Sequence, residues 1–131
     1  DSGDLAVAGL NPHAGEGGAF GREEIEEVAP AVEAARRAGV PAVGPVAPDT
    51  VFHSALKGCY CGVVCMYHDQ GHIPMKTVDF EGGVNITMGL SVVRSSVDHG
   101  TAFDIAWKGV AACESFLKAV DYAEALIKSR G

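Results

Sequence analysis

Short apolar runs, separated by turns rich in glycine and polar residues, recur along the chain and have the length of buried strands. The first covers residues 5–10, and two more cover residues 40–46 and 61–66. Further extended segments are expected near residues 84–88 and 91–97. Short apolar runs bounded by turns are typical of strands covered on both faces. The pattern predicts an α/β sheet.

The segment after the first apolar run has the periodicity of a helix. Its apolar residues recur every three or four positions, which places them on one buried face; they are Ile25, Val28, Ala29, Val32 and Ala35. Glutamates fill the first turns, where they complement the positive end of the helix dipole. Strand, glycine-rich loop and helix together predict half of a βαβ unit.

Three further helices are expected. Asp49 is a candidate N-cap for a helix over residues 50–57, and another helix is expected over residues 101–108. The last, over residues 115–128, is expected to bury an apolar face made of Phe116, Val120, Ala123 and Ile127. Repeats, low-complexity tracts and linkers are absent from the sequence, so we expect one α/β unit over residues 1–131. Because the chain opens at Asp1, almost directly on a strand, we expect it to be part of a longer protein.

Composition narrows the class of partner. The net charge of -7 argues against a nucleic-acid surface, which needs clustered Lys and Arg. A few converging cations can still bind a phosphorylated metabolite. The longest apolar run near the start is too short for a membrane span, so no membrane association is expected. Four cysteines without a targeting segment favour a cytoplasmic location.

Two polar clusters directly follow apolar strands, where ligands bind in open α/β sheets. The first runs from Asn11 to Gly18 and contains His13; its glycines allow close backbone approach to a ligand. The alternative for this loop is a tight turn with an exposed histidine. The second runs from His68 to His72, and imidazole is the commonest metal ligand. Gly71 and Pro74 predict a loop there, which argues against two histidines on one helix face binding a metal.

Further candidates come later in the chain. Lys76 and Arg94 suit a phosphate or carboxylate, and Asn85 suits a hydroxyl or amine, although each alone could be a solvated surface residue. The turn Asp98, His99, Gly100 and Thr101 lies at a strand end and could simply cap a helix.

The order of these segments resembles one family. Residues 9–16 read GLNPHAGE, residues 66–71 MYHDQG, residues 83–87 GVNIT and residues 94–102 RSSVDHGTA. Together they resemble the 4-hydroxythreonine-4-phosphate dehydrogenase family over nearly the whole chain. Chains of that family are longer, so the resemblance implies a C-terminal part. It also implies a three-layer α/β/α fold of the isocitrate and isopropylmalate dehydrogenase type, from a two-domain chain that forms a homodimer with its active site at the interface.

The resemblance also assigns roles. It implies that His13 and His68 bind a divalent metal with a third, upstream histidine. Zinc suits imidazole ligands best, although magnesium, cobalt and manganese are possible. Substrate-binding positions fall on Lys76, Asn85 and Arg94, and Asp49 and Asp69 match acidic residues near the catalytic centre. By analogy with the related dehydrogenases, Asp98, His99, Gly100 and Thr101 are candidates for contacting NAD or NADP.

The reaction implied is oxidation of 4-phosphohydroxy-L-threonine with loss of carbon dioxide, giving 3-amino-2-oxopropyl phosphate in vitamin B6 synthesis. Relatives with the same signature oxidise 4-phosphoerythronate or 4-phosphothreonate in sugar-acid breakdown, which is the alternative. A third alternative is a metal- or phosphate-binding remnant without catalysis. We expect the 131 residues alone to be inactive.

Overall fold

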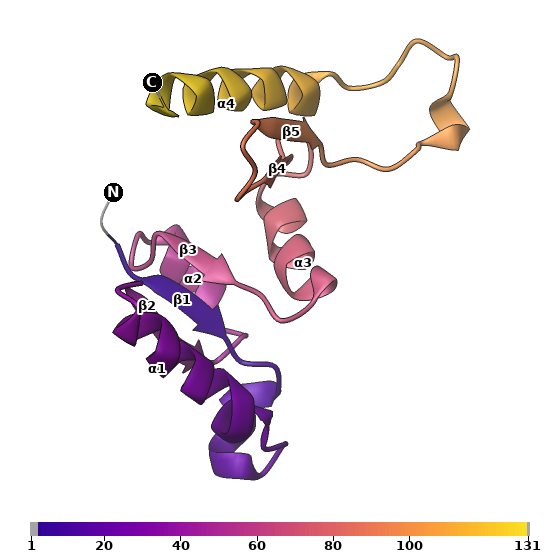
Figure 1. Cartoon of the computed structure of the whole chain (residues 1–131). Coiled ribbons are helices and arrows are strands. Elements are labelled where there is room, and N and C mark those ends of the chain that lie inside the picture. Colours follow the sequence, from indigo (N-terminus) through magenta and orange to yellow (C-terminus); the bar gives the residue numbers. More distant parts are fainter. Residues whose placement is uncertain (1–2, 131) are drawn as a thin grey trace. The chain divides into compact units, whose positions relative to one another are not determined.

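A computed structural model describes residues 3–130 of the chain (Figure 1). The chain divides into two compact units, Asp1–Pro74 and Met75–Gly131, and each is described by itself. One α/β unit over the whole chain therefore stays a prediction. Within the described residues, no helix combines the length and the apolar character needed to cross a membrane.

A three-stranded parallel sheet forms the centre of the first unit. Its strands are β1 (Leu5–Ala8), β2 (Ala42–Val46) and β3 (Gly62–Val64), in the order β2-β1-β3. β1 pairs with β3 in register from Leu5↔Gly62 to Val7↔Val64. Because the strands are parallel, their carboxyl ends meet at one edge of the sheet.

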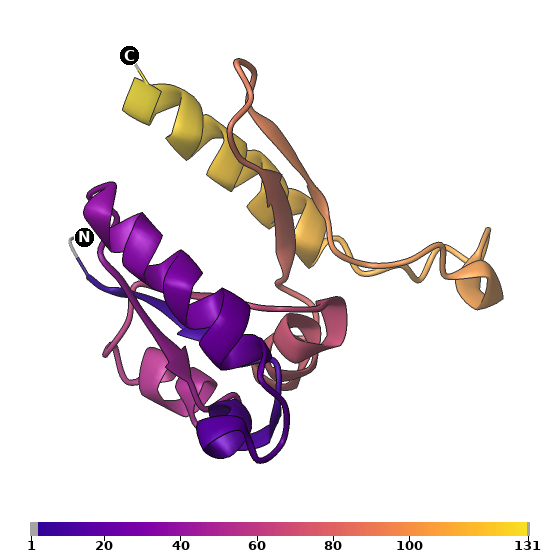
Figure 2. The same cartoon turned by 60° about the horizontal axis from the view of Figure 1, so that its bottom comes forward.

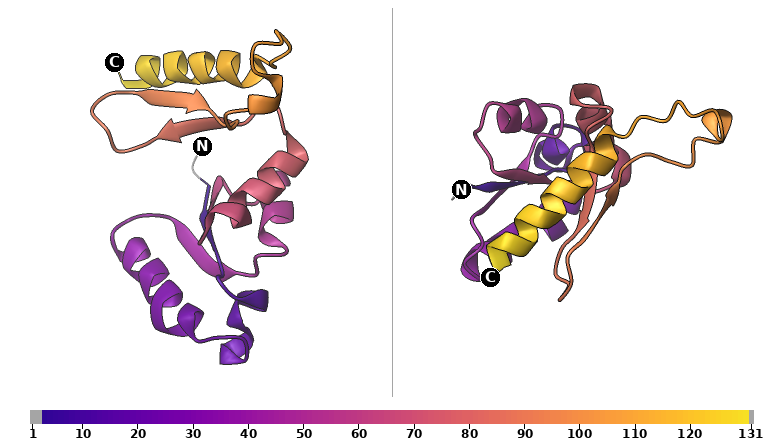
Figure 3. Two further views of the ribbon diagram at one scale, coloured as in Figure 1. Left: turned by 90° about the vertical axis from the view of Figure 1, so that its right-hand side faces the viewer. Right: turned by 90° about the horizontal axis from the view of Figure 1, so that it is seen from above.

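Helices cover both faces of this sheet. The α2 helix (Val51–Leu56) contributes Val51, which is completely buried with Ala6 and Ala8. The α1 helix (Ala29–Arg37) packs on the opposite face, where Val32 forms a core cluster with Val28 and Ala42. Figure 3 shows these layers. The predicted α/β/α arrangement is confirmed for this unit.

The entry to α1 differs from the predicted helix. A π-helical turn, η2 (Glu24–Val28), precedes α1, and Ile25 is 44% exposed although its spacing predicts a buried position. A π turn holds an extra residue, which rotates the side chains around the axis. Glu24, at 2% exposure, takes the inward position instead. The glutamate run is therefore not simply a solvated first turn.

An antiparallel hairpin and a long helix form the second unit. The strands β4 (Val84–Thr87) and β5 (Arg94–Val97) lie in the two segments expected to be extended, and they pair antiparallel along their whole length. The α4 helix (Glu114–Arg130) lies along the hairpin, as Figure 2 shows. The Ser95 hydroxyl ties the two together by donating a hydrogen bond of 2.8 Å to the Ala119 carbonyl.

The buried face of α4 is not the predicted one. Ser115 and Ala119 are buried. Of the predicted face, Ala123 is half-buried, whereas Phe116, Val120 and Ile127 are each more than half exposed. The helix carries apolar residues on two faces, and the hairpin covers the face with the small residues, which allow close approach.

Two other local predictions are wrong. The segment expected to be a loop is the α3 helix (His68–Val78), which contains Pro74 and extends across the boundary between the units. Proline removes one backbone hydrogen bond, and α3 tolerates that loss. The helix expected over residues 101–108 does not form; only a short turn, η3 (Phe103–Ile105), is present. Ala102 and Trp107 both have positive φ, which interrupts a right-handed helix.

Candidate functional site

Three loops of the first unit follow the carboxyl ends of its parallel strands. His13 lies in the loop after β1, Asp49 in the turn after β2, and His68 at the start of α3, the helix after β3. This edge is where α/β sheets bind ligands. The fold thus places three of the predicted site residues on one edge of one sheet.

The loop after β1 has an unusual backbone. His13 lies in η1 (Pro12–Gly18), where it and the following residues have left-handed φ and ψ angles; φ is 54° at His13 and 53° at Ala14. Such angles are disfavoured for residues other than glycine, and they persist where the surroundings enforce them. His13 is exposed, and the centroid of its ring lies 6.2 Å from that of the Phe20 ring.

Glu24 and Asn11 hold the start of this loop. One carboxylate oxygen of Glu24 accepts a hydrogen bond of 2.6 Å from the backbone amide of Asn11. The other accepts one of 2.9 Å from the Asn11 side-chain amide. A buried carboxylate requires such partners, because burial without them strongly disfavours its charge. The buried Glu24 carboxylate therefore fixes the backbone two residues before His13.

Opposing effects act on the pKa of Glu24. Burial raises it, whereas hydrogen bonds from the side chain and backbone of Asn11, and from the backbone amides of Glu24 and Leu10, lower it. Together the hydrogen bonds outweigh burial and hold the pKa of Glu24 below its ordinary value. The carboxyl group is therefore ionised in the neutral range.

Glycines make room for this carboxylate. A Cβ atom on Gly15 would lie 2.7 Å from Oε2 of Glu24, and one on Gly9 would lie 3.2 Å from Oε1. Gly15 is buried and has φ of +80°, which also favours glycine. The glycine-rich loop thus packs closely around the Glu24 carboxylate.

His68 is oriented by its neighbour in the sequence. It is the first residue of α3, and its Nδ1 lies 2.7 Å from Oδ1 of Asp69. A carboxylate can only accept, so Nδ1 is the donor and Nε2, on the other side of the ring, is left as the basic nitrogen. This carboxylate–histidine arrangement is common where histidine binds a metal.

His72 stacks on His68. Because the segment is helical, these residues lie one turn apart, and their rings are 3.9 Å apart with only 7° between their planes. The lone pair of an imidazole lies in its ring plane. Two parallel stacked rings therefore do not aim their nitrogens at one point, and His72 is placed to support the His68 ring rather than to chelate with it.

The donors at this edge fit part of a divalent metal site. Two imidazoles on adjacent strand ends, one of them paired with a carboxylate, suit zinc or a similar ion. Among residues 3–130, no group of three or more His, Cys, Asp or Glu side chains is arranged to hold a metal ion. The described residues thus provide two candidate ligands, and a complete site needs at least one more.

Asp49 does not cap α2. Thr50 is the N-cap residue, without a side-chain cap bond, and its hydroxyl donates to the Ala47 carbonyl at 3.3 Å instead. Asp49 is exposed in the turn before it. Its carboxylate thus lies at the edge of the sheet that carries His13 and His68, and it does not cap the helix.

The predicted substrate-binding residues lie in the second unit. Asn85 pairs with Ser96 and Thr87 with Arg94, so Asn85 and Arg94 share one face of the β4–β5 hairpin. Both are exposed, and Nη1 of Arg94 donates to the Thr87 hydroxyl at 2.9 Å. This is the face opposite to the one on which Ser95 bonds α4, so it is open to a ligand.

Lys76 is half-buried in the last part of α3. Its Nζ lies 3.9 Å from Oδ2 of Asp98 and 5.9 Å from the centre of the Phe80 ring. The ion pair joins a predicted substrate-binding residue to the first residue of the predicted dinucleotide turn. Lys76 is therefore held close to the end of β5.

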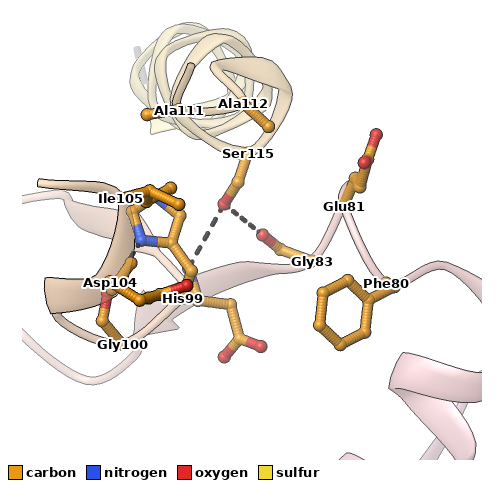
Figure 4. A pocket seen from close by; sticks show the side chains of 12 residues that line it. Phe80, Glu81, Gly83, His99, Gly100, Asp104, Ile105, Ala111, Ala112 and Ser115 are labelled. Atoms are coloured by element: carbon orange, nitrogen blue, oxygen red, sulfur yellow. Dashed lines mark hydrogen bonds between the residues drawn. The ribbon is translucent and has the colours of Figure 1, made fainter. Parts of the chain in front are cut away.

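A cavity of about 450 Å³ adjoins that turn. Asp98, His99 and Gly100 line it, whereas Thr101 does not. The Ser115 hydroxyl lies at the side of this cavity and points toward Gly83 (Figure 4). It accepts a hydrogen bond of 3.2 Å from the Asp98 amide and donates one of 2.6 Å to the Gly83 carbonyl. The other lining residues are Phe80, Glu81, Gly83, Ala102, Asp104, Ile105, Ala111, Ala112 and Ser115. Three of the four predicted turn residues thus face one cavity.

Two buried polar residues of the first unit were not assigned a role from the sequence. Gln70 is 7% exposed and Glu24 is 2% exposed. Gln70 lies within the MYHDQG segment, two residues after His68, and this position in the sequence could have marked it as a candidate support for His68. Glu24 lies in a run of glutamates that resembles a solvated helix start, and only the surrounding glycines hint at its burial.

Comparisons with known proteins agree with the resemblance. A family model described as the pyridoxal phosphate biosynthetic protein PdxA matches residues 1–123. The chain is 59% identical over 127 residues to a 4-hydroxythreonine-4-phosphate dehydrogenase of Caulobacter vibrioides, covering 97% of this chain and 38% of that protein. It is 57% identical over 119 residues to a D-threonate 4-phosphate dehydrogenase of Pectobacterium atrosepticum, covering 91% of this chain and 36% of that protein.

A solved structure shows the same fold. The crystal structure of a 4-hydroxythreonine-4-phosphate dehydrogenase from Klebsiella pneumoniae matches 92% of this chain with a TM-score of 0.82 and 59% identity, and the match covers 37% of that protein. The chain thus spans a little more than a third of the length of these relatives. It belongs to the family of the pyridoxal phosphate biosynthetic protein PdxA.

Proposed function

We propose that the full-length protein is a metal-dependent dehydrogenase that uses NAD or NADP to oxidise 4-phosphohydroxy-L-threonine, with loss of carbon dioxide, to 3-amino-2-oxopropyl phosphate. This is a step of vitamin B6 synthesis. The observation that carries the proposal is the placement of His13 and His68 at adjacent parallel strand ends, with His68 oriented by Asp69. The dehydrogenases among the relatives support the reaction class.

In this proposal the first unit contributes metal ligands. His13 and His68 bind the ion through neutral imidazoles, with Asp69 keeping the His68 proton on Nδ1. A bound divalent metal would polarise the hydroxyl oxygen on the carbon that is oxidised. Asp49, exposed at the same edge of the sheet, is proposed to take part in proton transfer. Zinc is the metal that suits this donor set best.

The second unit is proposed to bind the anionic groups of the substrate. Arg94 and Lys76 supply cations for phosphate and carboxylate, and Asn85 supplies an amide for a hydroxyl or amine. The cavity beside Asp98 and His99 is proposed to take part of the dinucleotide. Fixing the substrate between charged contacts leaves its reacting carbon in one orientation.

A second substrate class has a specific observation in its favour. The 57% identity to a D-threonate 4-phosphate dehydrogenase is close to the 59% to the biosynthetic relative. The phosphorylated acids 4-phosphothreonate and 4-phosphoerythronate keep the phosphate and hydroxyl but lack or replace the amino group. The metal and phosphate contacts would therefore serve either class, and the choice depends on groups that recognise the amine.

The deciding experiment is an assay of dinucleotide reduction by the full-length protein. It compares 4-phosphohydroxythreonine, 4-phosphothreonate and 4-phosphoerythronate, each with and without added zinc after chelation. We expect the highest kcat/KM on 4-phosphohydroxythreonine. Preference for one of the other acids would establish the sugar-acid alternative, and metal binding without turnover of any of them would establish a non-catalytic protein. We also propose that the protein is cytoplasmic and forms a homodimer. Light scattering of the full-length protein tests the dimer.

A further inference from the structure

The buried side chain of Gln70 joins the ends of two strands. Its Nε2 donates a hydrogen bond of 2.7 Å to the carbonyl of Gly9. Its Oε1 accepts one of 2.6 Å from the backbone amide of Met66. Both bonds are short, and the side chain is only 7% exposed, so water competes little for either bond.

The two bonded backbone groups lie at the starts of the histidine-bearing segments. Gly9 directly follows β1 and precedes His13 by four residues, while Met66 precedes His68 by two. The parallel ladder between β1 and β3 ends at Val7↔Val64. Beyond that pair the strands no longer bond each other, and Gln70 bridges them instead.

The bridge complements the contacts on the other side of the His13 loop. Glu24 fixes Asn11, and the Gly9 amide donates to the Val46 carbonyl at 2.8 Å. These contacts tie the loop to η2 and to β2. Gln70 ties it to the segment that carries His68. Gln70 therefore adds a side-chain bridge between the His13 and His68 segments, beyond the end of the β1–β3 ladder.

Burial of an amide is costly unless both of its ends are bonded. An apolar residue at position 70 would fill the space, but it would leave the Gly9 carbonyl and the Met66 amide without these partners. A requirement for a fixed spacing accounts for a polar residue there. The first turn of α3 then has three consecutive residues with different roles. His68 is the proposed ligand, Asp69 orients its ring, and Gln70 bridges the two strand ends.

We propose that Gln70 is a positioning residue of the metal site, which sets the spacing between the His13 and His68 imidazoles by bonding Gly9 and Met66. The inference rests on the proposed function, because it takes those two histidines as metal ligands. It predicts that loss of the bridge weakens metal binding directly, and not only through a less stable fold.

The test uses the full-length protein with Gln70→Leu, which removes both bonds, and Gln70→Glu, which keeps the acceptor for Met66 but loses the donor to Gly9. Zinc dissociation constants are measured by competition with a chromophoric chelator, without substrate or dinucleotide. We expect Gln70→Leu to raise the constant by about 10- to 100-fold, as loss of residues that orient metal ligands does. If Gln70→Leu fails to fold, the measurement rests on Gln70→Glu, which keeps the bond to Met66 and loses only the bond to Gly9.

Ser115→Ala is the matched control. Ser115 is also buried, at 6% exposure, and also bridges two backbone groups, but in the unit that lacks His13 and His68. We expect it to lower the thermal midpoint while leaving zinc affinity unchanged. The visible absorption of the cobalt-substituted protein gives a second readout, because it reports ligand geometry and should change in the Gln70 variants alone.

The outcomes separate the two proposals. If His13→Ala and His68→Ala lose zinc while both Gln70 variants retain wild-type affinity and cobalt absorption, the role of Gln70 is overturned and the metal site stands. Equal loss of affinity in Ser115→Ala and Gln70→Leu also overturns it, since the effect would be general. If the wild-type protein binds no zinc, or the histidine variants bind it normally, the metal-dependent function fails, and this inference fails with it.

Discussion

Glu24 accepts hydrogen bonds from both the backbone amide and the side-chain amide of Asn11, 13 residues earlier in the chain. One buried carboxylate thus determines the path of the backbone as it leaves β1. Because the pKa of Glu24 lies below its ordinary value of 4.5, the charged form stabilises the fold. The consequence is a measurable dependence of stability on pH.

Glu24→Gln should lower the free energy of unfolding by about 1.5–3 kcal/mol at neutral pH, the range for a hydrogen bond to a charged group. A lowered pKa gives stability that is present above the ordinary value and lost as pH falls through the folded-state pKa. The difference between wild type and variant should therefore shrink below pH 4.5. Urea unfolding of the full-length protein across this range measures it. Glu33→Gln, on the exposed face of α1, is the control, and a gap that stays constant with pH would contradict the role of Glu24.

Gly15→Ala and Gly17→Ala form a second pair. Both glycines have positive φ, so either alanine costs about 1–2 kcal/mol in backbone strain. Only at Gly15 would the new Cβ meet Glu24, at 2.7 Å; at Gly17 it meets open space. We expect Gly15→Ala to be the more destabilising by about 1–3 kcal/mol, the usual cost of overpacking. The denaturant midpoints of the two variants measure the difference. Equal losses of stability in both would refute close packing around Glu24.

Replacing His68 tests its proposed role as a metal ligand. His68→Ala should abolish metal-dependent NADH formation by the full-length protein, because it removes the imidazole. Asp69→Asn keeps the imidazole but loses the carboxylate 2.7 Å from Nδ1, and should raise the metal dissociation constant by about 10- to 100-fold. Asp121→Asn, on an exposed position of α4, serves as the control. Normal turnover in His68→Ala would exclude His68 as a ligand.

Arg94→Lys tests the substrate anion site. Lysine keeps the charge but not the fork of donors that matches a phosphate or carboxylate. We expect KM for the phosphorylated substrate to rise by about 10- to 100-fold, equivalent to one charge-assisted hydrogen bond. Arg36→Lys, on exposed α1, should leave KM unchanged. Steady-state kinetics measure both, and an unchanged KM in Arg94→Lys would place the substrate anion elsewhere.

Much of the fold follows from patterns that are local in the sequence. Apolar runs identify the strands, and their parallel order puts His13 and His68 at one edge. The errors arise where distant contacts outweigh local preference. Pro74 and Gly71 predict a loop, yet α3 forms there, with Gln70 of its first turn bonded to Gly9 across 61 residues. A bond between such distant residues leaves no periodic trace in the sequence.

The candidate site is predictable in its residue types and less so in its supports. Histidines at strand ends are visible as polar residues after apolar runs. The burial of Glu24 is not, because a π turn replaces Ile25 with Glu24 on the inner face. The candidate ligand-binding residues are thus easier to predict from the sequence than the residues that support them.

The register between β1 and β3 links correct folding to competence for binding. A slip of one residue along Val7↔Val64 would displace one histidine segment by about 3.3 Å relative to the other. It would also turn the slipped strand's side chains to the opposite face of the sheet. A chain misaligned here would lose core packing and ligand geometry together. Quality control that removes poorly packed chains would then also remove chains in which the proposed metal ligands are misplaced.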